Sequence, residues 1–237
     1  MLRQVNHWME FVGTAVDVLL LLRVLTLKLH KTYLFLTLAC ALEVFFDGVG
    51  LWLGDSPEWT RVFVYSRFLY AFIFPVAAWD VFEELSAQLN NVRRAAISRI
   101  VTSLLLVCIC GLIFSGLGDT SDENSGWMFT TTFAVILWAG SATGSLTFLW
   151  VMHKNLRAQA LEPPNNTLVW LIFFELLLGG EIFSCFFLFF NELLSLDMRE
   201  AVQLLLGVYS TAITAWCIFR LKGIPSDVPS APVNANS

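Results

Sequence analysis

The sequence predicts an all-α, polytopic membrane protein, built as a transmembrane helical bundle with seven spans. Of its 237 residues, 57% are hydrophobic and 14% are charged, and the mean hydropathy is +0.70. Soluble globular domains are only about 45–50% apolar and about 25% charged. A bilayer core of about 30 Å requires about 20 apolar residues per helix, and the chain contains seven such stretches.

The same composition excludes several other classes of protein. The chain is too apolar for a disordered protein and lacks the repeats of a fibrous one. Its 14 Lys and Arg against 19 Asp and Glu leave a net charge of −5. Because nucleic-acid binding depends on an excess of basic residues, we expect no nucleic-acid partner. The lipid bilayer is the expected partner.

Each predicted span is an apolar stretch bounded by polar, glycine-containing or proline-containing turns. The first is expected to stay as a helix rather than be cleaved as a signal peptide, because Glu10, Asp17 and Arg23 interrupt its apolar run. Residues 1–222 form one transmembrane domain, and 223–237 are predicted to be a disordered cytoplasmic tail. The seven spans lie at about 8–29, 32–54, 60–85, 98–117, 127–152, 167–190 and 198–221.

The basic residues near the span ends predict the N-terminus outside and the C-terminus in the cytoplasm, because cytoplasmic loops are enriched in Lys and Arg. The side assigned to the cytoplasm holds Lys28, Lys31, Arg93, Arg94, Arg99, Lys154, Arg157, Arg220 and Lys222, and the outer side holds Arg3, Arg61 and Arg199. The tryptophans agree, since they gather near both sets of span ends. All five cysteines fall inside spans, where we expect them to be buried packing residues: Cys40, Cys108, Cys110, Cys185 and Cys217. The absence of cysteines outside the spans favours a bacterial inner membrane.

Seven ionisable residues inside the spans are the most informative feature of the sequence. A charge at mid-bilayer costs about 2.5–3.5 kcal/mol on insertion scales and faces the bundle interior. At about 1.5 Å of rise per residue, Asp47 and Arg67 come out at matched depth near the outer surface, and Arg23 and Glu175 at matched depth near the inner one. We therefore expect Asp47 to pair with Arg67, and Arg23 to form a structural ion pair with Glu175. These seven residues are Asp17, Arg23, Glu43, Asp47, Arg67, Glu175 and Glu181.

The carboxylates near mid-depth predict a polar site inside the bundle. Glu43 and Asp47 lie four residues apart and share a helix face. A matching polar stripe runs along span seven and consists of Gln203, Gly207, Ser210, Thr214 and Cys217. The predicted site binds an ion, a proton or a small polar ligand, and its residues are Asp17, Glu43, Asp47, Arg67 and Glu181.

Three functions fit these features. The first is a small ion- or proton-coupled transporter or a ligand sensor. The second is an accessory subunit of a larger membrane complex, since buried polar residues also join membrane helices at about 0.6 kcal/mol per contact. An intramembrane enzyme comes third, because the sequence offers no nucleophile with a base and no catalytic residue can be named. The three histidines lie near span ends and predict no metal site, and the sequence indicates no particular cofactor.

Overall fold

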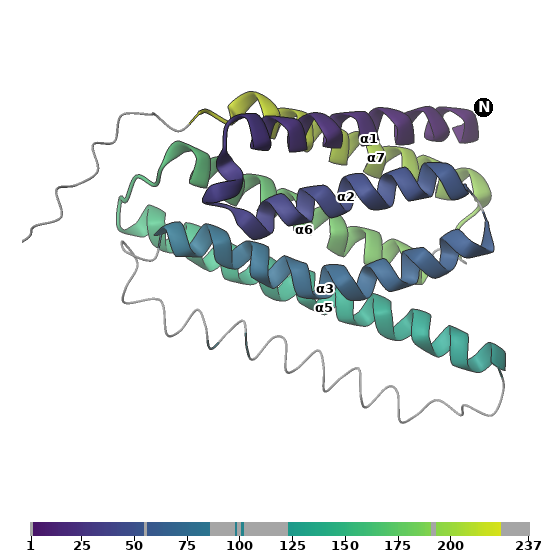
Figure 1. Cartoon of the computed structure of the whole chain (residues 1–237). Helices are drawn as coiled ribbons and strands as arrows, with labels where there is room; N and C mark the ends of the chain where they lie inside the picture. Colours follow the sequence, from purple (N-terminus) through teal and green to yellow (C-terminus); the bar gives the residue numbers. More distant parts are fainter. Residues whose placement is uncertain are drawn as a thin grey trace, which may run out of the picture.

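The protein folds into a bundle of α-helices (Figure 1). The structure is a computed structural model that describes residues 2–54, 56–85, 98, 101, 123–190 and 193–223. A short 3-10 turn, η1 (Leu29–Lys31), connects the first two helices. The helices are α1 (Leu2–Thr26), α2 (Leu34–Leu53), α3 (Pro57–Leu85), α5 (Glu123–Ala158), α6 (Asn165–Phe190) and α7 (Leu196–Arg220).

Five of the described helices are long and apolar enough to cross a membrane. These candidate spans are α2, α3, α7 and the segments Thr130–Ala158 of α5 and Asn165–Leu188 of α6. Helix α1 occupies the first predicted span but is not among the five, because Glu10, Asp17 and Arg23 add polar character to its apolar run. The predicted fourth span, 98–117, and nearly all of the predicted tail lie outside the described residues. The chain is thus compatible with an integral membrane protein, while seven spans and their orientation stay predictions.

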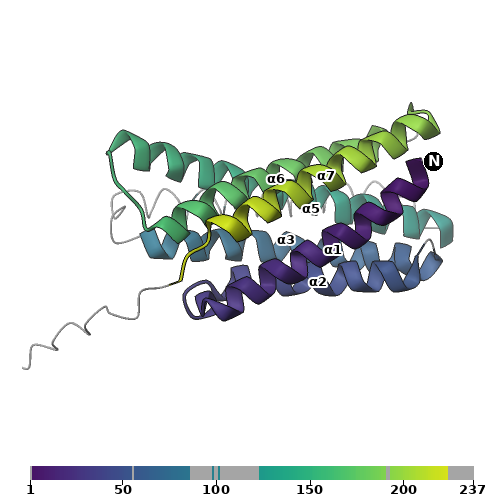
Figure 2. The ribbon, with the colours of Figure 1, turned by 90° about the horizontal axis from the view of Figure 1, so that it is seen from above.

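The six helices form a closed ring in the order α1, α2, α3, α5, α6, α7, and α7 packs back against α1. Helix α3 also contacts α6 across the ring. Helices α1, α3, α5 and α7 run in one direction and α2 and α6 in the other (Figure 1). Seen from above, α1 lies between α2 and α7 (Figure 2). This arrangement lets side chains from α1, α2, α6 and α7 reach a shared interior.

The tightest packing lies among α3, α5 and α6. Trp138, Trp170, Phe74, Phe82 and Phe174 are among the largest fully buried side chains. Their rings make edge contacts between helices, for example Phe74 with Phe174 at a centroid distance of 6.2 Å. Offset and edge-to-face pairs of this kind stabilise beyond the area that they bury. The aromatic side chains thus form the packed core of one half of the ring, and α1, α2 and α7 complete the other half.

Polar contacts fix the helix ends on the side of the bundle that holds η1. Tyr33 and Thr167 share a hydrogen bond of 2.8 Å that joins the start of α2 to the start of α6. The Asn166 side chain donates to the Lys222 carbonyl at 2.8 Å and accepts from the Lys222 N–H at 2.9 Å. The start of α6 is therefore tied to both α2 and the end of α7.

Candidate functional site

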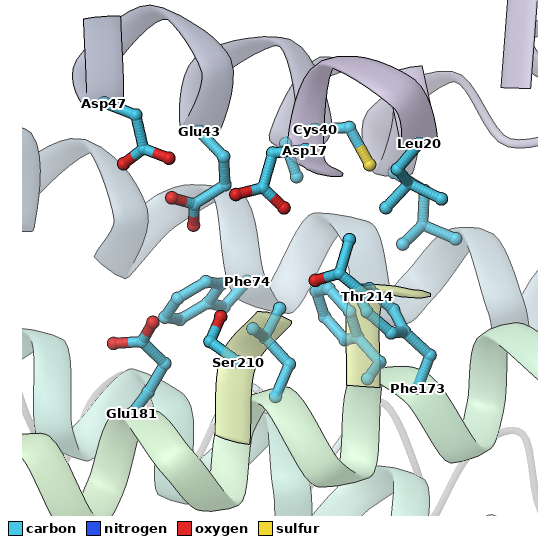
Figure 3. Close-up of a pocket in the computed structure, with 14 residues that line it drawn as sticks. Asp17, Leu20, Cys40, Glu43, Asp47, Phe74, Phe173, Glu181, Ser210 and Thr214 are labelled. Carbon is cyan, nitrogen blue, oxygen red and sulfur yellow. The ribbon is translucent and has the colours of Figure 1, made fainter. Parts of the chain in front are cut away.

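A cavity of about 110 Å³ lies among α1, α2, α3, α6 and α7 (Figure 3). A water molecule occupies about 30 Å³ in the liquid, so the cavity has room for several waters or one small ligand. Sites for drug-sized molecules are larger, at about 300–1,000 Å³. The lining residues are Asp17, Leu20, Leu36, Ala39, Cys40, Glu43, Asp47, Phe74, Phe173, Phe174, Leu177, Glu181, Ser210 and Thr214.

All four carboxyl residues of the predicted site line this cavity. Asp17 comes from α1, Glu43 and Asp47 from successive turns of α2, and Glu181 from α6. Figure 3 shows the first three on one side of the cavity and Glu181 on the opposite side. The convergence predicted from matched depths is present in the fold. Their role in binding a ligand stays a prediction.

The carboxyl groups are close enough to interact with one another. Asp17 interacts with both Asp47 and Thr214, and Glu43 interacts with Glu181, Asp47 and Asp17. Carboxylates that share a site of low dielectric constant repel one another unless a proton or a cation lies between them. The cavity is therefore an electrostatically favourable place for a positive charge.

Arg67 lies beside the carboxyl cluster but has a different partner from the one predicted. Its Nη1 is 3.8 Å from Oε2 of Glu181, and its guanidinium carbon is 4.2 Å from the ring centroids of both Phe63 and Trp138. The predicted ion pair with Asp47 is wrong, because the guanidinium lies against one ring of α3 and one ring of α5 and is paired with Glu181 of α6. Asp47 still interacts electrostatically with Arg67 at longer range.

Arg23 and Glu175 do not form the predicted pair either. Helix α1 packs against α7, so Arg23 Nη2 donates to the Leu221 carbonyl at 3.1 Å. Glu175 points from α6 toward α5 and lies 2.9 Å from Nδ1 of His153. The two residues have similar depths in different parts of the ring, which depth matching alone cannot distinguish.

The structure also reveals contacts that sequence reasoning missed. Nε2 of His153 accepts a hydrogen bond from Nε of Arg157 at 3.1 Å, so the ring proton lies on Nδ1 and is donated to Glu175. The spacing of four residues between His153 and Arg157 was the available signal. Asp80, within a predicted span, accepts hydrogen bonds from the first N–H groups of α2. Asp80 is 45 residues from Phe35 in the sequence, so no local sequence pattern indicates this contact.

The predicted polar stripe of α7 contributes in part. Ser210 and Thr214 line the cavity, whereas Gln203, Gly207 and Cys217 are not among its lining residues.

Cys40, Cys185 and Cys217 are buried free thiols, as predicted, and Cys108 and Cys110 lie outside the described residues. Within the part of the chain that the structure describes, no group of three His, Cys, Asp or Glu residues is arranged to hold a metal ion.

Comparison with known proteins gives no family for this chain. No protein-family model matches it, and neither the curated proteins nor the solved structures contain a significant match.

Proposed function

We propose that this protein is a small integral membrane transporter that binds a cation or a proton in the cavity between Asp17, Glu43, Asp47 and Glu181. The observation that carries the proposal is the convergence of four carboxyl groups from three helices on one cavity. The bacterial inner membrane, with the end that holds η1 in the cytoplasm, is part of this proposal.

The balance of charge supports binding over mere helix packing. Residues that only join helices need matched polar partners, whereas Arg67 is paired with Glu181 and three further carboxyl groups face the cavity. Bringing carboxylates into a membrane interior without a positively charged partner is costly. A mobile positive charge in the cavity would offset that cost, and its entry and exit would be transport.

The cavity residues nearest the η1 end of the bundle are apolar and buried. Leu20, Leu36 and Phe174 are each at most 3% exposed, and they lie on the η1 side of Asp17, Glu43 and Glu181 along their helices. This apolar layer lies between the carboxyl groups and that face. Transport would require α1 and α2 to move apart here, as in alternating access.

The test is cation flux through the full chain in liposomes. We would measure proton flux with an entrapped pH dye, and Na⁺ and K⁺ flux with tracers. The Glu43→Gln/Glu181→Gln variant keeps side-chain shape but removes two charges, and should lower flux at least tenfold. The control is Glu58→Gln/Glu84→Gln, which removes two exposed carboxylates and should transport normally. Unchanged flux in the first variant, at equal folding and incorporation, would contradict the proposal.

Native mass spectrometry of the gently extracted protein tests the accessory-subunit alternative. A transporter should appear as this chain alone or as copies of it. A second protein at fixed stoichiometry would instead assign the intramembrane charges to assembly.

A further inference from the structure

The two sides of the cavity have different chemistry. The carboxyl groups of Asp17, Glu43 and Asp47 lie on one side, and the rings of Phe74 and Phe173 lie on the other, where Glu181 and Ser210 are the polar neighbours of the rings (Figure 3). Phe174 also lines the cavity, and all three rings are at least 96% buried. The ligand that fits must therefore satisfy an acidic wall and an apolar, aromatic wall at the same time.

A buried hydroxyl lies beside the acidic wall. Tyr70 is 1% exposed, and its hydroxyl makes no hydrogen bond of normal geometry to a described residue. It interacts with Glu43 and, more weakly, with Glu181, both of which line the cavity. The Tyr70 hydroxyl is therefore a polar group at the edge of the acidic wall that interacts with Glu43.

Three kinds of cation can be compared with these walls. A hard metal cation takes six or more oxygen ligands around it, which the phenyl rings cannot supply. A proton needs only a carboxylate and makes no use of the aromatic rings. An ammonium group donates strong charge-assisted hydrogen bonds to carboxylates, and its apolar substituents pack on aromatic rings, with cation–π attraction within about 6 Å.

We propose that the cavity binds a small protonated amine with a compact apolar body, an inference that rests on the proposed cation-binding function. The ammonium group lies between Asp17, Glu43 and Asp47, and the body packs on Phe74, Phe173 and Phe174. Arg67 neutralises Glu181 from outside the cavity, which leaves the other three carboxyl groups for the ligand. A cavity of about 110 Å³ limits the amine to a few carbon atoms.

The experiment measures thermal unfolding and calorimetric binding of the detergent-purified full chain at pH 7. The probes are the chlorides of piperidinium, methylammonium, Na⁺ and K⁺ at equal ionic strength. Tetrahydropyran, which has the same shape as piperidine but no charge, is the matched control. We expect piperidinium to raise the Tm by several degrees and to bind at least tenfold more tightly than the other probes.

Two variants test separately what the aromatic wall and the acidic wall contribute to binding. Phe173→Leu keeps an apolar side chain but removes a ring, and should weaken piperidinium binding about tenfold through loss of one aromatic contact. Glu43→Gln/Asp47→Asn should abolish the response, and Glu58→Gln/Glu84→Gln should leave it unchanged. A cooperative thermal unfolding transition in the absence of ligand shows that each variant is folded.

The outcomes distinguish this inference from the proposed function. If tetrahydropyran stabilised the protein as much as piperidinium, or if Phe173→Leu bound piperidinium as tightly as wild type, the inference that the ligand is an amine would be overturned. The chain could instead bind or transport Na⁺, K⁺ or protons through its carboxyl groups and fail to bind piperidinium. This result would overturn the inference of an amine ligand and would still support the proposed cation site. No carboxyl-dependent binding or flux of any probe would overturn both.

Discussion

Asp80 stabilises the start of a helix other than its own. Its Oδ2 accepts hydrogen bonds from the backbone N–H groups of Phe35 and Leu36, at 2.5 and 3.1 Å. The first N–H groups of a helix have no partner within the helix, and a negative charge there also interacts favourably with the helix dipole. This carboxylate of α3 thus replaces the side-chain cap that α2 lacks at Tyr33.

Removing this cap should destabilise the bundle. We expect Asp80→Ala to lower the free energy of unfolding by about 1 kcal/mol, the usual cost of a lost helix cap. Asp80→Asn keeps a side-chain oxygen and should lose less. Thermal unfolding in detergent gives the comparison, and equal stability of Asp80→Ala and wild type would contradict the capping role.

The pair of Arg67 and Glu181 makes a second prediction at this scale. Each of the two side chains is less than one-fifth exposed, so removing one leaves the other charge unpaired. We expect Arg67→Met to cost about 3 kcal/mol and the double variant Arg67→Met/Glu181→Gln to cost less than the single one. Arg67→Lys should also destabilise, because the planar guanidinium that stacks between Phe63 and Trp138 is lost.

A double-mutant cycle on unfolding free energies measures this coupling. The Glu181→Gln single variant completes the cycle. Additive effects of the two substitutions would show that the pair does not interact in the folded protein.

At the scale of elements, Gly180 sets the approach of α6 to α7. A Cβ atom on Gly180 would lie 2.9 Å from Cε1 of Tyr209, whereas one on Gly179 would meet nothing within 4 Å. The Tyr209 hydroxyl donates to the Leu176 carbonyl at 2.8 Å, so the ring cannot move away without losing that bond. Small residues allow this kind of close packing between membrane helices.

The two neighbouring glycines therefore provide a matched test. Gly180→Ala should destabilise the protein by about 1–3 kcal/mol through overpacking and displacement of Tyr209. Gly179→Ala should be neutral or slightly stabilising, since alanine favours the helix. Thermal unfolding of both variants checks the prediction, and a more harmful Gly179→Ala would contradict this packing.

At the scale of the whole molecule, the closed ring decides which residues meet. Helices α1 and α7, from opposite ends of the chain, pack side by side and complete the ring. This contact brings Asp17 next to Thr214 and both to the cavity. The site therefore depends on closure of the ring and should be lost whenever α1 is detached.

The orientation of the molecule is predicted from its basic residues and can be tested directly. Glu58 and Lys31 are exposed and lie at opposite ends of the bundle. We expect a membrane-impermeant maleimide to label Glu58→Cys but not Lys31→Cys on intact bacterial cells, with both labelled after permeabilisation. Wild type gives the background from native cysteines, and the reverse pattern would invert the topology.

The sequence by itself determined the helical class, most of the helix boundaries and the identity of the interior carboxylates. These follow from local properties, because apolar length sets the spans and the cost of burying charge places Asp17, Glu43, Asp47 and Glu181 inside the bundle. Only the tertiary structure decided the partners. Depth along a helix says nothing about position around the ring, so the predicted pairs of Arg67 with Asp47 and of Arg23 with Glu175 gave way to contacts with Glu181, Leu221 and His153. The aromatic wall of the cavity likewise has no sequence signature, because a phenylalanine that faces lipid and one that faces a ligand look the same until the helices are packed.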